Sequence, residues 1–530
     1  MHFLSSTRVK KSDSILAIDF GSSNSVACLL KKGHKQVVND NTESGIVAFP
    51  SFVEYKGNDI LTATAAKKRR VKGMTKFCVG CVKRLLGLTW DEYQHLEKKD
   101  IFGVDVVRGS DGYPRFVVSD DGRQVTCVEV ASELFRRIKN DADALNGAPI
   151  DDCYVTVPAN YKDNQREAIK DAARDAGLNV KAIIIEPTAA AMSWCFDNEK
   201  ELVQGEKMLV FDFGGGTFDL SLLKYDGNGS FSVMDTDGDP KMGGNDVDAE
   251  IAKEVCRIVK DVEDIPFNPL RTKKRAQFLA VCEEAKTQLS SQKSASIDVS
   301  EFNPDLDTEI IFTREQLNDI VNRLFMSKIN NCIDRMTNKP DRTCGVIKRV
   351  FMVGGSSRLL AVREAVKRRF SNAKFPDINP DTSVAEGALS IAKMQKEGKN
   401  KIHEAINFSY GLLAGTDVVM LLNRGTRIPC ESGAITFCNS TDYPDNIFSA
   451  IYQWNGIQSG QSGRVLKPMS ECTKVREYSF KNDNPLPKGQ QVFDIVFRLS
   501  FGGTLEVICK DKNTGRELNR RVYDSLIARE

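Results

Sequence analysis

Two stretches of this chain share one pattern of apolar and polar positions: an apolar run ending in Asp-Phe-Gly, a turn of small residues, and a second apolar run. The first stretch spans residues 15–27 and the second spans residues 208–222. Short apolar runs bounded by glycine turns are typical of buried β-strands. We therefore predict two strand–turn–strand units, one at the start of each of two α/β halves.

The residues of the two turns indicate what kind of ligand these units bind. Glycine brings backbone N–H groups close to a ligand, and consecutive N–H groups form a concavity that binds anions such as phosphate. The aspartate before each turn, Asp19 or Asp212, lies where it can hold Mg²⁺ through water molecules. One such turn alone is more often an ordinary hairpin, but two in one chain favour a site that clamps phosphates from both sides.

Two further glycine pairs extend this prediction. Gly243 and Gly244 lie in a turn at residues 242–246. Gly354 and Gly355 follow an apolar strand and precede a helix predicted over residues 359–370. A strand–loop–helix of this kind is a common place for the sugar and base of a nucleotide to lie against backbone.

After about residue 400 the pattern changes to short alternating strands separated by turn residues. Residues 418–429, 492–499 and 503–508 carry this pattern most clearly. Strands of this length and spacing predict a β-sandwich.

Composition sets limits on the class of protein. A chain of 530 residues is too long for one hydrophobic core, so several domains are expected. A hydrophobic share of 41% is that of a soluble globular protein, and a net charge of +2 gives no argument for nucleic acid as a partner. No run approaches the roughly 20 apolar residues of a membrane span, and residues 1–14 hold no signal-peptide stretch. We expect a cytoplasmic protein without a membrane span.

Two local clusters have both a structural and a functional interpretation. Cys78 and Cys81 have the spacing of metal ligands or of a redox pair, but none of the 14 cysteines forms a second pair of comparable spacing. We therefore predict structural cysteines. The basic run at residues 67–72 is the pattern of a nucleic-acid patch, and we interpret it instead as the solvated face of a helix beginning near residue 65.

Six segments carry a family resemblance in order and spacing across residues 14–395: residues 18–23, 155–159, 186–191, 211–219, 242–244 and 353–356. The chain resembles the seventy-kilodalton heat-shock chaperones, within the superfamily of actin and the sugar kinases. Glu-Pro-Thr-Ala-Ala-Ala at residues 186–191 separates the chaperones from the other members. The resemblance implies an α/β actin-like ATPase domain of duplicated ribonuclease H-like halves, followed by a β-sandwich that binds substrate.

The resemblance also implies a division of the chain and its cofactors. It places a flexible N-terminus at residues 1–13, a two-lobed nucleotide-binding domain at 14–396, a linker at 397–407 and a β-sandwich at 408–530. The implied cofactors are ATP or ADP and Mg²⁺, with Asp19 and Asp212 organising the metal and its waters. The implied catalytic residues are Asp19, Lys83, Glu186, Asp212, Thr217 and Asp219. Among them Lys83 matches the lysine that helps to orient the attacking water.

The remaining implied site residues bind nucleotide, couple the domains or hold peptide. The nucleotide contacts are Gly21, Ser22, Ser23, Asn24, Gly214, Gly215, Gly216, Thr217, Gly243, Gly244, Glu283, Lys286, Ser290, Gly354, Gly355, Ser356, Arg358 and Asp381. Pro158 and Arg166 match an interdomain switch. Phe437, Phe448, Ala450 and Ile451 are candidates for a peptide channel, with packing in the sandwich core as the alternative.

The chain departs from the family pattern at several positions. Ser22 and Ser23 replace paired threonines but keep their hydroxyl groups, so nucleotide binding is expected to persist. Residues 399–407 replace a run of leucines that couples the two domains in the family. Because the sequence ends at Glu530, soon after the last predicted strand, we expect no helical lid over the peptide channel.

These observations leave two main hypotheses. The first is a chaperone ATPase that hydrolyses ATP slowly, binds unfolded or extended polypeptides weakly, and works with a J-domain cochaperone and a nucleotide-exchange factor. The second is a non-cycling interaction or cochaperone protein, of the ribosome-associated type or a viral homologue, that keeps nucleotide as a structural ligand. A sugar kinase is disfavoured by Glu186-Pro187-Thr188 and by the C-terminal sandwich.

Overall fold

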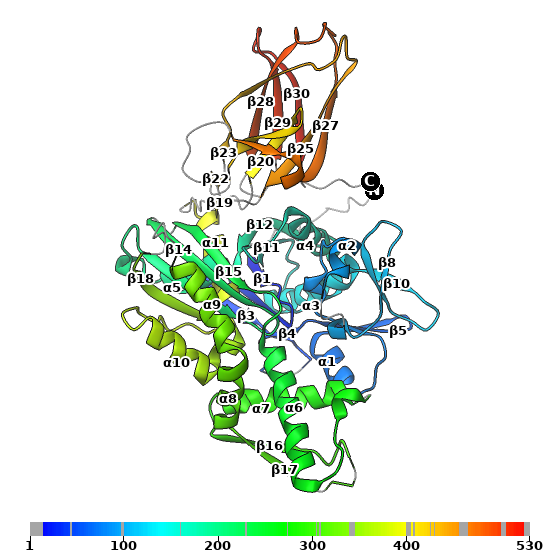
Figure 1. The fold of residues 1–530 in the computed structure, drawn as a ribbon, viewed down its shortest axis with the longest axis vertical. Coiled ribbons are helices and arrows are strands. Elements are labelled where there is room, and N and C mark those ends of the chain that lie inside the picture. Colours follow the sequence, from blue (N-terminus) through cyan, green and yellow to red (C-terminus); the bar gives the residue numbers. More distant parts are fainter. Residues whose placement is uncertain are drawn as a thin grey trace, which may run out of the picture.

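The structure is a computed structural model that describes residues 14–523, apart from residues 43–44, 97–99, 160, 228–229, 273, 304, 307–308, 339–344, 399–403, 406–408, 424–425, 429, 455–464 and 500–504. The predicted N-terminus at residues 1–13 and most of the predicted linker at 397–407 lie outside the described residues. The described chain is a mixed α/β part with a β-rich C-terminal part above it (Figure 1).

The first large sheet contains the first predicted strand–turn–strand unit. Its strands are β1 (Ile15–Asp19), β2 (Asn24–Lys31), β3 (His34–Val38), β4 (Phe49–Pro50), β11 (Asp152–Val157) and β12 (Asn179–Ile185). The order is β12-β11-β1-β2-β3, with β4 paired to β2. β1 runs antiparallel to β2 and parallel to β11. The hairpin predicted from the apolar pattern is thus confirmed.

The second large sheet repeats these pairings. Its strands are β13 (Lys207–Phe213), β14 (Phe218–Gly227), β15 (Ser230–Asp239) and β18 (Ile347–Val353), in the order β15-β14-β13-β18. β13 is antiparallel to β14 and parallel to β18. The second predicted hairpin is therefore confirmed as well. We call the elements from β1 to β12 the first lobe and those from β13 to α10 the second lobe.

Helices cover both sheets. They are α1 (Ala63–Val71), α2 (Trp90–Gln94), α3 (Cys127–Asn146), α4 (Asp163–Asp175), α5 (Glu186–Cys195), α6 (Gly244–Glu263), α7 (Arg275–Leu289), α8 (Arg314–Leu324), α9 (Met326–Thr337), α10 (Leu360–Arg369) and α11 (Ser383–Lys396). The predicted helix at 359–370 is confirmed as α10. Among the described residues, no helix is long and apolar enough to cross a membrane.

Three smaller sheets and several short 3₁₀ turns complete the α/β part. The sheets are β6 (Asp59–Thr62) with β5 (Phe52–Lys56) and β7 (Cys78–Gly80), β10 (Gln124–Thr126) with β9 (Pro114–Val117) and β8 (Val106–Arg108), and β16 (Ser294–Asp298) with β17 (Glu309–Thr313). The turns are η1 (Val82–Arg84), η2 (Asp100–Phe102), η3 (Glu199–Glu201), η4 (Pro269–Arg271) and η5 (Gly355–Arg358), with η6 (Met469–Glu471) in the C-terminal part.

The C-terminal part is built from two five-stranded sheets. The first is β26 (Leu466–Pro468), β21 (Asp417–Leu422), β20 (Ser409–Ala414), β25 (Asn446–Trp454) and β27 (Thr473–Lys481). The second is β23 (Cys430–Glu431), β28 (Val492–Leu499), β29 (Leu505–Asp511) and β30 (Glu517–Tyr523), with β24 (Ile435–Cys438) also paired to β28. A short pair, β19 (Glu404–Ala405) and β22 (Arg427–Ile428), lies near β15 of the second lobe.

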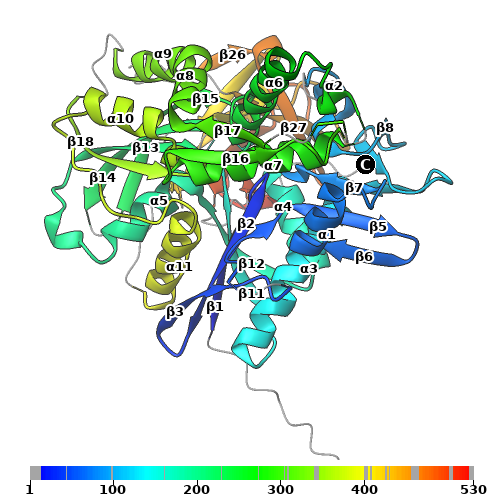
Figure 2. The ribbon, with the colours of Figure 1, turned by 90° about the horizontal axis from the view of Figure 1, so that it is seen from below.

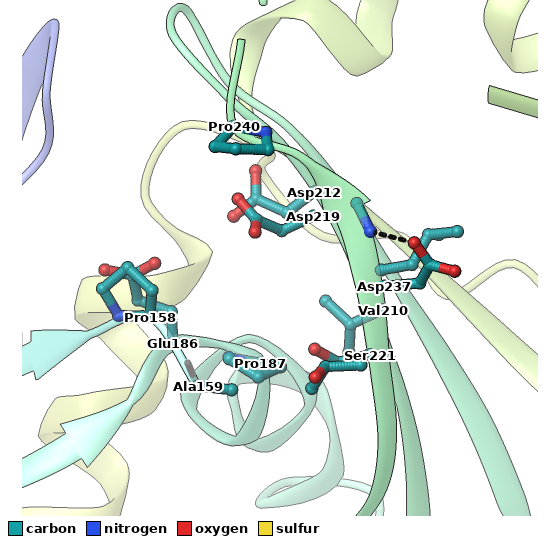
Figure 3. A pocket seen from close by; sticks show the side chains of 13 residues that line it. Pro158, Ala159, Glu186, Pro187, Val210, Asp212, Asp219, Ser221, Asp237 and Pro240 are labelled. Carbon is teal, nitrogen blue, oxygen red and sulfur yellow. Dashed lines mark hydrogen bonds between the residues drawn. The ribbon is translucent and has the colours of Figure 1, made fainter. Parts of the chain in front are cut away.

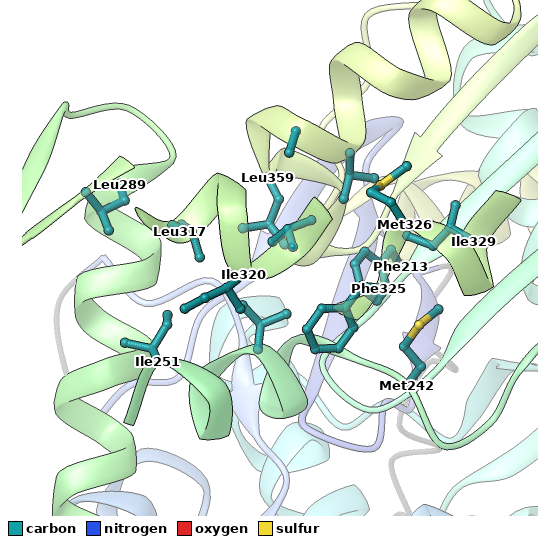
Figure 4. Packing of buried hydrophobic residues seen from close by; sticks show 14 of the residues in the cluster. Phe213, Met242, Ile251, Leu289, Leu317, Ile320, Phe325, Met326, Ile329 and Leu359 are labelled. Carbon is teal, nitrogen blue, oxygen red and sulfur yellow. The ribbon is translucent and has the colours of Figure 1, made fainter. Parts of the chain in front are cut away.

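Each part has its own apolar core. In the second lobe, Phe213 at the end of β13 packs in a cluster with residues of α6, α8 and α9, such as Ile251, Ile320 and Ile329 (Figure 4). A separate cluster fills the first lobe around Phe20 and Phe135, whose rings stack 4.8 Å apart. These cores fix the hairpin ends, and with them the turns that follow.

A third cluster joins the two lobes through α5 and α11, which pack against each other. A Cβ added at Gly387 of α11 would lie 1.7 Å from the carbonyl oxygen of Ala189 in α5. Only glycine allows the two helix backbones to approach this closely. The crossing therefore fixes where the two lobes meet.

The two local clusters singled out from the sequence pack within the first lobe. Cys78 and Cys81 are buried, and burial raises the pKa of the Cys78 thiol to about 12. The basic run lies on α1, as predicted, but its face is not uniformly solvated. Arg69 pairs with the buried Glu54 at 2.7 Å, and Arg70 donates to the carbonyl of Cys78 at 2.7 Å. The expectation of a wholly solvated helix face is wrong, because these guanidinium groups hold α1 against β5 and β7.

Candidate active site

A cleft of ≈ 690 Å³ lies where the two hairpins end. It is lined by most of the predicted site residues: Asp19, Gly21, Ser22, Ser23, Asn24, Lys83, Pro158, Glu186, Asp212, Gly214, Gly215, Gly216, Thr217, Asp219, Glu283, Lys286, Ser290, Gly354, Gly355, Ser356, Arg358 and Asp381. Gly243 and Gly244 lie directly behind this lining, because the N–H of Gly244 donates to the carbonyl of Gly214 at 2.9 Å. Positions separated by up to 362 residues, from Asp19 to Asp381, thus meet at one place.

The two glycine turns face each other across the cleft. In the first turn the N–H of Gly21 donates to Ser25 Oγ at 3.2 Å, and in the second the N–H of Gly214 donates to the carbonyl of Thr217 at 3.0 Å. A Cβ added at Gly215 would lie 2.5 Å from Ser23 Oγ of the opposite turn. The absence of a side chain at Gly215 therefore lets the turns come close enough to hold one ligand.

A third turn, at residues 354–356, also lines the cleft. Gly354 has a φ of +78°, and a Cβ there would lie 2.5 Å from the carbonyl oxygen of Phe213. The conformation and the close approach both require glycine. Beside it, Ser356 Oγ donates to the carbonyl of Gly214 at 3.0 Å, so the η5 turn is attached to the second glycine turn.

Four carboxyl groups and one lysine gather between the two turns. Lys83 Nζ lies 2.7 Å from Glu186 Oε1, and both side chains are largely buried, at 8% and 14% exposure. Thr156 Oγ1 donates to Asp19 Oδ1 at 2.9 Å and orients that carboxyl group. Asp212 is the last residue but one of β13 and Asp219 is the second residue of β14, and they oppose each other in the hairpin register.

The electrostatics of this cluster follow from burial. Burial raises the pKa of Asp212 well above its usual range, and repulsion from Glu186, Asp219 and Asp19 adds to the rise. Burial likewise raises the pKa of Glu186 to about 7, although the attraction of Lys83 works against it. Burial alone lowers the pKa of Lys83, but its carboxylate and Tyr161 neighbours outweigh burial and raise it. The cluster holds four carboxyl groups but only one ammonium group, so the carboxyl groups repel one another. A bound cation would offset this repulsion.

The far end of the cleft is lined by Glu283, Lys286, Ser290, Arg358 and Asp381, the residues predicted to contact sugar and base. Lys286 Nζ pairs with Asp248 at 2.8 Å and donates to the carbonyl of Gly244 at 3.1 Å. Arg358 Nη2 donates to Asp381 Oδ2 at 2.7 Å, which holds the guanidinium plane at the rim. Ser290 Oγ donates to the carbonyl of Thr287 at 2.6 Å, so its hydroxyl hydrogen is directed to its own helix.

The sequence reasoning missed Arg84, Asn245 and Tyr161, which line the cleft, and Lys67, which pairs with a residue of its lining. Arg84 contacts the carbonyl of Gly216, and Asn245 Nδ2 lies 3.5 Å from Ser23 Oγ. Tyr161 donates its hydroxyl to the carbonyl of Lys83, and Lys67 pairs with Glu283 at 2.9 Å. Arg84 and Asn245 adjoin predicted residues in the sequence, and that adjacency was the available signal. No local pattern pointed to Tyr161 or Lys67.

A second cavity, of ≈ 170 Å³, continues from the cleft beneath the carboxyl cluster (Figure 3). Pro158, Glu186, Asp212 and Asp219 line both cavities, and Figure 3 shows Asp212 and Asp219 on one side of the smaller cavity with Pro158 and Glu186 on the other. Arg166 lines neither cavity. Its Nε donates to the carbonyl of Tyr161 at 3.3 Å, in the loop that begins at Pro158. The two predicted switch residues are thus close neighbours of the cleft.

The four predicted channel residues lie in different environments. Ile451 is fully buried in the core of the C-terminal part, and Phe437 is partly buried against the same core. Ala450 belongs to a separate small cluster with Met420, since adjacent residues of a strand face opposite sides of the sheet. Phe448 is 73% exposed. A peptide channel formed by these four residues stays a prediction.

Within the residues that the structure describes, no group of three or more His, Cys, Asp or Glu side chains is arranged to bind a metal ion directly. A comparison with protein-family models matches residues 15–526 to the family described as Hsp70 protein. This match covers nearly the whole chain, including the hairpins, the cleft and both sheets of the C-terminal part.

Proposed function

The chain belongs to the Hsp70 family, and from that premise we propose that it is an ATP-dependent chaperone that binds and slowly hydrolyses ATP. The observation that carries the proposal is the pair of glycine turns facing each other, with Lys83 and Glu186 paired at 2.7 Å between them. Phosphoryl transfer requires positioned donors for the phosphates, positive charge and a group that places water. This cleft offers all three.

The proposed nucleotide-binding domain spans residues 14–396 and consists of two duplicated ribonuclease H-like lobes. The support is the repeated pairing of β1 with β2 and β11, and of β13 with β14 and β18. Such a duplication explains why two hairpin turns meet around one ligand. The sugar and base would lie between Glu283, Lys286 and Arg358.

The carboxyl cluster fits Mg²⁺. Asp19 and Asp212 would hold the ion through its waters, since their buried oxygens face the cleft and repel one another without a cation. The ion supplies charge neutralisation at the phosphates. Lys83 keeps its proton and presents an ammonium group beside the phosphates, and Glu186 holds that ammonium in place. Thr217 hydrogen-bonds Asp219, which fixes the second turn beside the last phosphate.

Lys83 and Glu186 are largely buried between the lobes, so their charges act where screening is weak. Pro158 and Glu186 line both the cleft and the smaller cavity, and that cavity has room for the water molecule that attacks. We propose that the attacking water is placed by Lys83, Glu186 and Asp219. The remaining residues bind and orient ATP without taking part in proton movement.

The test is single-turnover ATP hydrolysis by Lys83→Ala and Asp212→Ala. We expect hydrolysis to fall about 100-fold or more in each, since each removes a charge at the reacting phosphate. Nucleotide binding should persist, because the backbone of the glycine turns is unchanged. Lys72→Ala, an exposed lysine at the end of α1, is the matched control. If both cleft variants hydrolyse ATP like the parent, the catalytic assignment is wrong.

We further propose that the β-sandwich at residues 408–530 binds unfolded or extended polypeptides, with fast exchange. The proximity of β19 to β15 supports contact between the sandwich and the second lobe. A J-domain cochaperone and a nucleotide-exchange factor are the proposed partners. Stimulation of single-turnover hydrolysis by an extended apolar peptide and a J-domain protein together would support this cycle.

The second candidate is a non-cycling interaction protein that keeps nucleotide as a structural ligand. The observation that favours it is the sequence Lys-Asn-Lys-Ile-His-Glu-Ala-Ile-Asn at residues 399–407, which has none of the family's leucines. Under this alternative, peptide and J-domain protein leave ATP turnover unchanged, and an array of extended apolar peptides shows no general binding.

A further inference from the structure

Lys83 lies in a backbone segment with little regular structure of its own. The η1 turn has three residues, and Cys81 before it adopts a left-handed φ of 55°. Its hydrogen bonds run from the N–H groups of Arg84, Leu85 and Leu86 to the carbonyls of Cys81 and Val82. So short a turn does not by itself fix where the Lys83 side chain points.

Tyr161 supplies a bond that the turn lacks. Its hydroxyl donates to the carbonyl oxygen of Lys83 at 3.0 Å, and the bond is buried. The same ring lies 5.9 Å from Lys83 Nζ, at the distance of a cation–π contact. One side chain therefore contacts Lys83 at both its backbone and its ammonium end.

Tyr161 is itself held by the loop that begins at Pro158. Its N–H donates to the carbonyl of Pro158 at 3.2 Å, and its own carbonyl accepts from Arg166 Nε at 3.3 Å. Three residues further on, Asn164 Nδ2 donates to the carbonyl of Gly87 at 2.6 Å. The loop and the first turn of α4 thus contact this segment at Lys83 and at Gly87.

We propose that Tyr161 is a positioning residue for Lys83, because its hydroxyl holds the Lys83 carbonyl and its ring lies beside the lysine ammonium group. This inference rests on the proposed ATPase function and deepens it. Tyr161 acts through Lys83 and does not itself contact the reacting atoms. Phenylalanine at this position would keep the ring and the packing but lose the bond to the Lys83 carbonyl.

The test compares Tyr161→Phe with the parent in single-turnover hydrolysis and in ATP binding. We expect the hydrolysis rate to fall about five-fold, the effect of one lost buried hydrogen bond, while the ATP dissociation constant changes less than about two-fold. Tyr154→Phe, a half-buried tyrosine of β11, is the matched control and should behave like the parent. A residue with only a structural role would not separate rate from binding in this way.

A double-mutant cycle shows whether Tyr161 acts through Lys83. In the Lys83→Ala background, Tyr161→Phe should leave the residual hydrolysis rate unchanged. Multiplicative effects of the two substitutions would overturn the proposal, as would a Tyr161→Phe variant that hydrolyses ATP like the parent. Loss of both ATP binding and thermal stability in Tyr161→Phe would also overturn it, because the hydroxyl would then be structural.

Different results would refute the proposed ATPase function and the positioning role of Tyr161. If the parent does not hydrolyse ATP, or if Lys83→Ala hydrolyses it as fast as the parent, the ATPase assignment falls and the positioning role falls with it. If the parent hydrolyses ATP and Lys83→Ala does not, a normal rate in Tyr161→Phe refutes the positioning role alone.

Discussion

Lys67 of α1 and Glu283 of α7 form an ion pair across the rim of the cleft, with Nζ and Oε2 2.9 Å apart. The first lobe contributes α1 and the second lobe contributes α7, and the two helices lie side by side at this edge (Figure 2). Burial alone raises the pKa of Glu283, but the attraction of Lys67 and Lys286 outweighs it and lowers the pKa. The pair therefore joins the lobes beside the predicted sugar-binding residues.

Lys67→Ala should release nucleotide faster. A partly exposed pair of this kind contributes up to about 1 kcal/mol, so we expect the dissociation rate to rise about two- to five-fold. The difference should shrink at high salt because the charges are screened. Stopped-flow release of a fluorescent ATP analogue measures the rate, with Lys72→Ala as the control. Equal release rates in the parent and Lys67→Ala would show that the pair does not hold the cleft closed.

Gly354→Ala should disrupt the cleft, whereas the neighbouring Gly355→Ala should be tolerated. At Gly354 the φ of +78° and the carbonyl of Phe213 at 2.5 Å leave no room for a Cβ, but at Gly355 a Cβ meets only Asp381 Oδ1 at 3.4 Å. We expect Gly354→Ala to lower the free energy of unfolding by about 2 kcal/mol or more and to weaken nucleotide binding. Urea unfolding and calorimetric titration compare the two variants. Similar results for both would contradict the geometry of this turn.

Glu186 should make the nucleotide-free protein less stable as pH rises. Burial raises its pKa from 4.5 to about 7, with repulsion from Asp19 adding and attraction from Lys83 opposing. Between these values the folded protein keeps a proton that the unfolded chain has lost, so the free energy of unfolding falls as pH rises. Glu186→Gln should flatten this part of the profile. Urea midpoints measured from about pH 5 to pH 7 give the slope. An unchanged slope would mean that Glu186 is already ionised throughout.

In the C-terminal part, Ile451→Ala should lower stability, whereas Phe448→Ala should leave stability nearly unchanged and test peptide binding. Ile451 is 0% exposed, so its truncation should cost about 2–4 kcal/mol of stability. Phe448 is 73% exposed, so its truncation should leave stability within about 0.5 kcal/mol. If Phe448 contacts peptide, the affinity for an extended apolar peptide falls in that variant alone. Unfolding curves and fluorescence anisotropy measure the two effects.

The apolar pattern predicted both hairpins and helix α10 because buried strands and glycine turns leave a local signature. It did not predict Tyr161, whose hydroxyl reaches a carbonyl 78 residues away. Nor did it predict Lys67, whose partner is 216 residues away. Such contacts depend on how lobes pack, and no spacing within the sequence records that. In the C-terminal part, alternation identified strands but did not settle whether Phe448 or Ile451 faces the core.

The close crossing of α5 and α11 limits how the cleft can open. Because a Cβ added at Gly387 would lie only 1.7 Å from the Ala189 carbonyl oxygen, the two helix backbones are already in contact. An opening of the cleft that kept this contact would be a rotation of the lobes about the crossing. A small rotation of the lobes about the crossing would produce a larger displacement at the far rim of the cleft, where α1 faces α7. Nucleotide exchange would then depend on a rotation of the lobes about the contact at Gly387.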